Sequence, residues 1–275
     1  MSATGTPNAT DTAASAQVTR SMLRHEVLPL YLRSLRVLLR VPSAVIPPLF
    51  IPVFFLVVNT AALGNLSNSP VLQGTNYVAF FVPVSILLTV SSAGSGSGLA
   101  LVQDIDAGYF DKLLLAPISR TSVLVSRLMV DGTRAAAQAL LVVAVSLLIG
   151  GEIAAGFVGV VLLVVMSFLF GLAYAGIGLT IALRTGSTEA TQASFIIFFP
   201  LVFLAPTFVP LDFLAEWLQT VAQLNPVTYV LLGMRSLTTE GIVAAELAKA
   251  FAAILGLAAL LLFSAFRALR ARAYR

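Results

Sequence analysis

The 275-residue sequence contains no cysteine and a single histidine, His25. It therefore has no disulfide framework and no thiolate ligand, and we expect no metal site. Charge is scarce too: 10% of the residues are charged, against about 25% in soluble domains. Because 59% of the residues are hydrophobic and the mean hydropathy is +0.98, a fold in water could not bury this apolar surface. The composition predicts an integral membrane protein.

The first 19 residues are rich in Thr, Ala and Ser and contain no apolar run. We predict a disordered cytoplasmic tail there and a membrane domain over residues 20–275. Between residues 20 and 40, leucines recur at helical spacing and arginines cluster beside that stripe; the nearest are Arg33, Arg36 and Arg40. This pattern is typical of an amphipathic helix on an anionic membrane face. An ordinary juxtamembrane extension with snorkelling arginines is the alternative.

Uncharged apolar runs predict six membrane-spanning helices, which makes the fold all-α. No charged residue occurs from Val41 to Gln103, a stretch long enough for two spans joined by the polar turn 64–70. The predicted spans cover residues 42–63, 77–99, 125–150, 156–183, 190–210 and 248–266.

The basic residues are distributed unevenly over the predicted loops. If both termini are cytoplasmic, all of the 16 basic residues except Arg235 and Lys249 lie on the cytoplasmic side. This asymmetry follows the positive-inside rule and predicts a multi-pass protein of the plasma (cytoplasmic) membrane with both ends inside. The basic excess is then explained by topology, so we expect membrane lipid as a partner and no nucleic acid.

Motifs of soluble enzymes are missing. The sequence has no G-x-x-x-x-G-K-[ST] loop that could hold a nucleotide phosphate. We assigned no charge to the middle of any span, so an acidic relay for ion-coupled transport is not expected. The Gly- and Ser-rich segment 91–98 contains no lysine, and we expect it either to allow close helix packing or to act as a flexible hinge.

The fifth predicted span is interrupted by Pro200, Pro206 and Pro210. Broken backbone at membrane depth must be buried in protein or line a cavity. We therefore predict that Pro206, Pro210 and the turn at Asn225-Pro226 shape an outer gate, near Arg235. Residues 211–224, which include Trp217, are expected to form an amphipathic segment that dips into the outer interface.

The loop between the second and third spans carries the densest mixed charge. Its pattern predicts a short helix with Phe110, Leu113 and Leu114 on one face, ended by Pro117. An apolar face outside the bilayer indicates a protein partner. The alternative is a solvated loop whose leucines dip into the membrane.

This loop resembles the signature loop of type-2 ATP-binding-cassette (ABC) transporter permeases, of the daunorubicin-resistance drug-export kind. The matching loop residues are Asp104, Gly108, Lys112, Leu113, Leu114, Pro117 and Arg120. Phe110 and Asp111 belong to the same loop, and Asp111 departs from the family pattern. A second mark is Asn225-Pro226, followed by Arg235, just before the last span. The order of all these features resembles the family over about residues 20–270.

The resemblance implies a permease subunit of an ATP-driven exporter for an amphipathic or lipid-like substrate. The chain itself would be no enzyme and would bind no cofactor, because a separate ATPase subunit would use ATP and Mg. Two permeases, either two copies or a copy and a paralogue, would assemble with two ATPases, and the loop 104–120 would be the coupling helix. A stand-alone channel or ion-coupled carrier is the alternative function.

Overall fold

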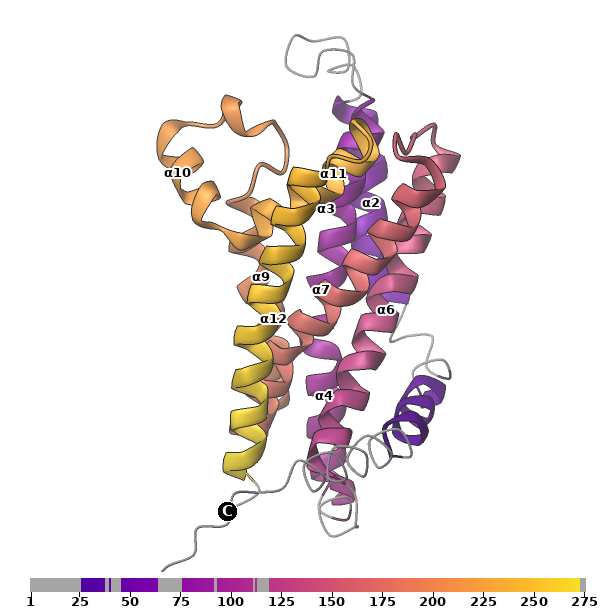
Figure 1. The fold of residues 1–275 in the computed structure, drawn as a ribbon. Coiled ribbons are helices and arrows are strands. Elements are labelled where there is room, and N and C mark those ends of the chain that lie inside the picture. Colours follow the sequence, from indigo (N-terminus) through magenta and orange to yellow (C-terminus); the bar gives the residue numbers. More distant parts are fainter. Residues whose placement is uncertain are drawn as a thin grey trace, which may run out of the picture.

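The computed structural model describes residues 26–37, 40, 46–63, 76–91, 93–110, 112 and 119–272. All regular elements in these ranges are helical (Figure 1), as the composition predicts. An N-terminal helical segment covers residues 26–37. The further helices are α2 (Ile46–Leu63), α3 (Tyr77–Ser91), α4 (Ala93–Asp106), α6 (Arg120–Leu148), α7 (Gly156–Thr185), α8 (Thr188–Gln192), α9 (Ser194–Phe203), η3 (Leu211–Phe213), α10 (Glu216–Leu224), α11 (Pro226–Thr239) and α12 (Ala244–Arg272).

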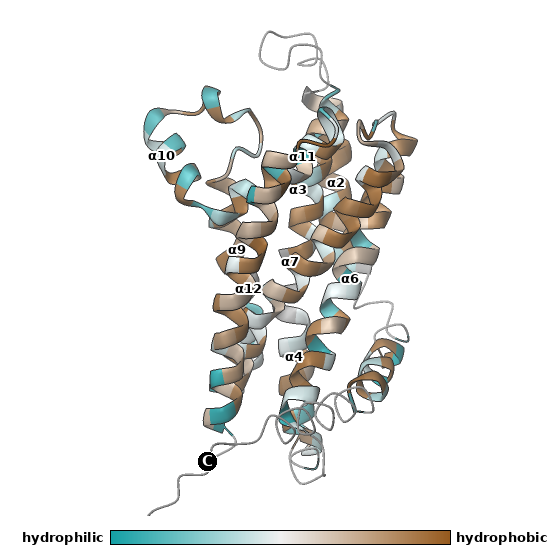
Figure 2. Ribbon diagram, in the orientation of Figure 1, coloured by the Kyte–Doolittle hydropathy of each residue, from teal (hydrophilic) through white to brown (hydrophobic). Residues whose placement is uncertain are grey.

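Among the described residues, three helices are long and apolar enough to cross a membrane, namely α6, α7 and α12. With about 30 residues each, they measure roughly 45 Å along their axes, which exceeds the hydrocarbon core of a bilayer. Shorter apolar helices lie at 47–62 and 77–90. Figure 2 shows hydrophobic ribbon along the middle of the bundle and hydrophilic residues near both ends. The protein is therefore a multi-pass membrane protein, while the exact six-span arrangement stays a prediction.

Helix α7 lies at the centre and packs against α4, α6 and α12. Glycines make this packing close: a Cβ on Gly98 of α4 would lie 2.6 Å from the carbonyl oxygen of Gly178. A Cβ on Gly176 would lie 3.0 Å from the Leu261 carbonyl oxygen of α12. The role in close packing predicted for the glycine-rich segment is confirmed at Gly98.

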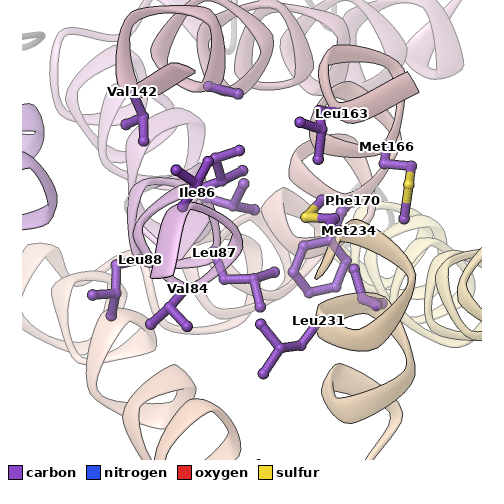
Figure 3. Close-up of a cluster of buried hydrophobic side chains, with 14 of the residues drawn as sticks. Val84, Ile86, Leu87, Leu88, Val142, Leu163, Met166, Phe170, Leu231 and Met234 are labelled. Carbon is purple, nitrogen blue, oxygen red and sulfur yellow. The ribbon is translucent and has the colours of Figure 1, made fainter. Parts of the chain in front are cut away.

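Two hydrophobic clusters fill the bundle. The larger one joins α3, α6, α7 and α11, and Figure 3 shows Phe170, Met166, Leu231 and Met234 among its side chains. The smaller cluster lies towards the lower end of the bundle in Figure 1, where α4, α6, α7 and α12 come together around residues such as Leu101, Leu124 and Leu179. Each cluster abuts a polar site, described below.

The fifth predicted span, residues 190–210, is not one continuous helix. Helix α9 ends at Phe203 and has 10 residues, about 15 Å or half of the hydrocarbon thickness. Pro206 and Pro210 cannot donate the backbone hydrogen bonds that would continue it. The chain then rises to the exposed helix α10 (Figure 1) and returns to α11. Helix α10 begins only at Glu216, so Phe213 and Leu214 precede the amphipathic helix that the sequence predicts.

Candidate functional site

The N-terminal helical segment 26–37 is fastened to the start of α6. A carboxylate oxygen of Glu26 accepts hydrogen bonds from the Ser119 backbone N–H at 2.9 Å and the Ser122 hydroxyl at 2.8 Å. Ser119 is also the N-cap of α6. Further along, the hydroxyls of Tyr31 and Thr133 lie 2.9 Å apart. The segment thus contacts α6 at two points along its length.

Arg33 connects this segment to the predicted coupling loop. Its guanidinium carbon lies 4.2 Å from the centre of the Tyr109 ring, a cation–π contact. Arg36 and Arg40 are exposed, as are Leu28 and Leu32 of the predicted apolar stripe. A helix over residues 26–37 therefore lies within the predicted range, and its residues Leu28 and Leu32 face away from the protein. Its placement on a membrane face stays a prediction.

The coupling loop begins with a turn at residues 107–108, directly after α4. Gly108 has a φ of +64°, the left-handed region that favours glycine. Phe110 differs from our expectation: it is 2% exposed and packs in the smaller hydrophobic cluster with α4 and α6 side chains. It therefore belongs to the interior and not to a free apolar face, because the turn at Gly108 folds the chain back onto the bundle.

The other described residues of the loop have different surroundings. Lys112 and Arg120 are exposed. Asp104 forms an ion pair with Arg127 of α6, which joins the two helices that flank the loop. The remaining predicted residues, Asp111, Leu113, Leu114 and Pro117, lie outside the described residues.

One helical turn after Arg127, α6 carries a buried ionic cluster of Asp131 and Arg134 that we did not predict. Asp131 is 2% exposed, and its carboxylate lies 3.3 Å from the Arg134 guanidinium. The same carboxylate accepts a hydrogen bond from the Ser97 backbone N–H at 3.1 Å. Ser97 lies in the first turns of α4, so Asp131 binds a backbone group near the N-terminus of that helix, where a negative charge is favoured. Asp131 and Arg134 lie near the middle of α6, so our expectation that no charge falls in the middle of a span is wrong for this helix.

Gly96 explains how this cluster fits between the helices. A Cβ at this position would overlap the Arg134 guanidinium. The Ser97 hydroxyl also donates to the Arg127 carbonyl oxygen at 3.0 Å. The spacing of Arg127, Asp131 and Arg134 on one face of a helix was the available signal. This signal is easily overlooked, because charged residues at the start of a predicted span are usually placed in the headgroup region.

A second polar site lies towards the upper end of the bundle, on α11. Arg235 is 6% exposed, although the sequence places it on the outer side of the membrane. Its guanidinium donates to the carbonyl oxygens of Phe80, Pro206 and Thr207 at 3.3, 2.8 and 3.2 Å. It also lies 3.7 Å from the centre of the Phe80 ring. No carboxylate forms an ion pair with it in the part of the chain that the structure describes.

Asn225 and Pro226 form the turn into α11. Pro226 is the first residue of the helix, and the Asn225 side chain caps it by accepting from the Val227 N–H at 3.0 Å. The Asn225 amide also donates to the Leu201 carbonyl oxygen at 2.5 Å, which ties the turn to α9. Pro210 precedes the short helix η3. The predicted outer-gate residues thus surround one break in the backbone, and Arg235 binds two of the carbonyl groups in that break.

Neither polar site has the composition of a catalytic or metal centre. Over the residues with described positions, no group of three or more His, Asp or Glu side chains could hold a metal ion. The geometry instead joins helices: Asp104, Arg127 and Asp131 link α4 to α6, and Arg235 links α3 and α11 to the broken fifth segment. Such an arrangement can transmit movement between helices.

Comparison with known proteins gives the class of protein. The model of the ABC-2 type transporter family matches residues 25–238, so the chain belongs to this family of ABC transporter permeases. Proteins of this family are membrane transport subunits and not enzymes, and ATP is hydrolysed by a separate subunit.

Individual members of the family share between 24% and 27% of their aligned residues with this chain. The chain is 27% identical over 232 residues to a putative transport permease, ycf38, of Cyanophora paradoxa, covering 81% of this chain and 77% of that protein. It is 24% identical over 197 residues to a probable doxorubicin resistance permease, DrrC, of Mycobacterium tuberculosis, covering 72% and 71%. The daunorubicin resistance permease DrrB1 of Streptomyces coeruleorubidus is 25% identical over 197 residues, covering 71% and 69%.

Proposed function

We propose that this permease belongs to an exporter that moves an amphipathic or lipid-like substrate out across the cytoplasmic membrane. Family membership provides the transport role and the separate ATP-binding partner. The drug-resistance names of two relatives support the direction and the chemical kind of the substrate. In this proposal two permeases, identical or paralogous, assemble with two ATPase subunits that bind ATP and Mg.

The observation that carries the proposal is the linkage at the lower end of the bundle. Helices α4 and α6 flank residues 107–119 and are held together by the Asp104–Arg127 pair and by the bond from Ser97 to Asp131. The N-terminal segment is attached to the same unit through Glu26 and Arg33. A force applied to the loop would therefore move α4, α6 and the surface helix together. A loop that passes movement from an ATPase to the membrane helices requires such a connection.

Leucines at the loop are the proposed docking residues. Because Phe110 packs inward, the proposal assigns the ATPase contact to Leu113 and Leu114, with Lys112 and Arg120 at its rim. Charged residues at a rim set orientation and association rate more than affinity.

The deciding experiment is a pull-down of the ATPase subunit encoded beside this chain, performed with equal amounts of membrane-inserted permease. We expect Leu113→Asp to lose both the ATPase and transport. Gln103→Asp, which places the same charge on an exposed position of α4, should retain them. Unchanged pull-down and transport in Leu113→Asp would refute the assignment of the coupling loop.

Orientation is tested separately by reporter fusions. The basic asymmetry of the loops predicts cytoplasmic signals after Arg120, Arg184 and Arg275. Fusions near Ser67 and Glu240 are expected to read external. A cytoplasmic signal at Ser67 would contradict the six-span topology.

A further inference from the structure

A pocket of about 760 Å³ opens between the last turns of α7 and α12. Three arginines line it: Arg184 from α7, and Arg267 and Arg272 from α12. The described residues that complete its lining are uncharged, and Thr185 and Ala268 are among them. The pocket therefore gathers positive charge from two helices that are far apart in the sequence.

The two walls of the pocket are fixed to each other. The Thr180 and Ser264 hydroxyls lie 3.0 Å apart between α7 and α12. At the rim, the Arg272 guanidinium donates to the Leu183 carbonyl oxygen at 3.1 Å, which holds this cation beside the end of α7 and satisfies one carbonyl there. The pocket is thus formed before any ligand enters.

Three guanidinium groups around one cavity repel one another unless an anion lies between them. Guanidinium groups match the oxygens of phosphate, to which they donate paired hydrogen bonds. Arginines that merely snorkel would extend singly towards water. Here three arginines from two helices line one pocket, although Arg184 and Arg267 also reach solvent, and a phosphate group is the ligand that this arrangement fits.

The surface next to the pocket is apolar. On α12, Leu260 and Phe263 are each 66% exposed and precede Arg267 by seven and four positions, so all three lie on one face of the helix. An acyl chain could lie along this face while its headgroup entered the pocket. Basic pockets between membrane helices bind anionic headgroups in this manner.

We propose that this pocket binds the phosphate headgroup of an anionic phospholipid, with an acyl chain along the Leu260–Phe263 face of α12. The ends of α7 and α12 that line it lie at the lower end of the bundle (Figure 1), the same end as the C-terminus of α4. With the orientation proposed above, the lipid belongs to the cytoplasmic leaflet. The proposal depends on the protein lying in a membrane and not on the identity of the exported substrate.

The test is native mass spectrometry of the full chain in detergent, titrated with phosphatidylglycerol or with phosphatidylcholine of the same acyl chains. We expect the wild type to retain phosphatidylglycerol preferentially. Arg267→Gln should weaken its binding by about fivefold, and the Arg184→Gln/Arg267→Gln double variant should remove the preference. Melting temperatures of the variants, measured in parallel, would show that the fold is kept.

Arg270→Gln is the matched control, because Arg270 is exposed on the same last turns of α12 but does not line the pocket. It should leave the preference for phosphatidylglycerol unchanged. Equal losses in Arg267→Gln and Arg270→Gln would indicate general attraction to a basic surface and would overturn the proposal. Absence of any preference in the wild type would overturn it as well.

A competition arm separates a lipid from a free anion. Inorganic phosphate or glycerol 3-phosphate at millimolar concentration should not displace phosphatidylglycerol, since neither carries an acyl chain. Displacement by either one would assign the pocket to a soluble phosphate and overturn the lipid proposal.

The Phe263→Ser variant tests the apolar face. It should weaken phosphatidylglycerol binding and keep the preference for phosphatidylglycerol over phosphatidylcholine, because it removes apolar contact and keeps the three arginines.

Discussion

Arg134 and Arg235 are both buried guanidiniums in a membrane protein, yet their surroundings differ. Arg134 lies beside the carboxylate of Asp131, in a cluster between helices α4 and α6. Arg235 instead binds three backbone carbonyl groups, two of them from the break after α9. At one site an opposite charge balances the cation. At the other the cation satisfies backbone groups that the broken helix leaves without partners.

This difference indicates what each site does for the fold. Backbone carbonyls without partners are costly in a bilayer, because no water is there to bind them. Arg235 therefore makes the proline-interrupted fifth segment possible. The Asp131 cluster joins helices that already satisfy most of their own backbone, so its role is to fix their relative position. Removing a charge should accordingly have different consequences at the two sites.

The largest effect is expected at Asp131. Asp131→Ala leaves the Arg134 cation buried without its carboxylate and should lower the free energy of unfolding by about 3 kcal/mol. For a protein of this size that corresponds to a fall in melting temperature of roughly 5 °C, measured in detergent. Asp106→Ala, which removes an exposed carboxylate of the same region, is the control and should change little. Asp131→Leu/Arg134→Met should recover most of the loss, since replacing both charges removes the penalty.

Arg235→Leu is expected to have the next largest effect. It leaves the Pro206 and Thr207 carbonyl groups unpaired and should cost about 2 kcal/mol. The change should be local: relative to the wild type, hydrogen exchange should become faster in residues 204–215 and stay the same in α7. Arg235→Lys keeps the charge but lacks the fork geometry that reaches three carbonyl groups. If residues 204–215 of the lysine variant exchanged hydrogen as slowly as in the wild type, the charge alone would account for the effect of Arg235.

A smaller effect is expected at the turn into α11. Asn225→Ala removes both the helix cap and the bond to the Leu201 carbonyl oxygen, at a cost of about 1 kcal/mol. Asn225→Asp keeps the cap but has no amide donor for Leu201. Its melting temperature should fall between those of the wild type and the alanine variant. Identical values for the two variants would mean that the bond to Leu201 accounts for the whole effect.

The smallest effect is expected at Glu26. Glu26→Gln removes the negative charge but keeps one acceptor oxygen, so it weakens the two hydrogen bonds from Ser119 and Ser122 without abolishing them. Because this contact is partly exposed, the cost should be about 0.5 kcal/mol, or roughly a twofold rise in hydrogen exchange of residues 26–37. Exchange in α11 serves as the internal reference and should not change. A much larger rise would mean that this one carboxylate holds the segment on α6.

Much of the fold follows from patterns that act locally. Uncharged runs of membrane length predicted the spans that correspond to α6, α7 and α12, because this signal depends on neighbouring residues.

What could not be predicted depends on which helices meet. The burial of Arg235 depends on Phe80, more than 150 positions earlier in the chain, and on carbonyl groups whose availability requires α9 to end early. The room for Arg134 depends on Gly96 of another helix. Phe110 was misplaced for a similar reason: spacing identifies an apolar face but does not show whether the face turns towards the chain's own core.

Trp217 gives the protein a built-in optical probe. It is the only tryptophan in the sequence and is 66% exposed on α10, the helix that follows the backbone break. Tryptophan emission from the unmodified chain therefore arises from that segment alone. Its wavelength and its quenching by brominated lipids can show how deeply α10 enters the bilayer, and whether that depth changes during transport, without any added label.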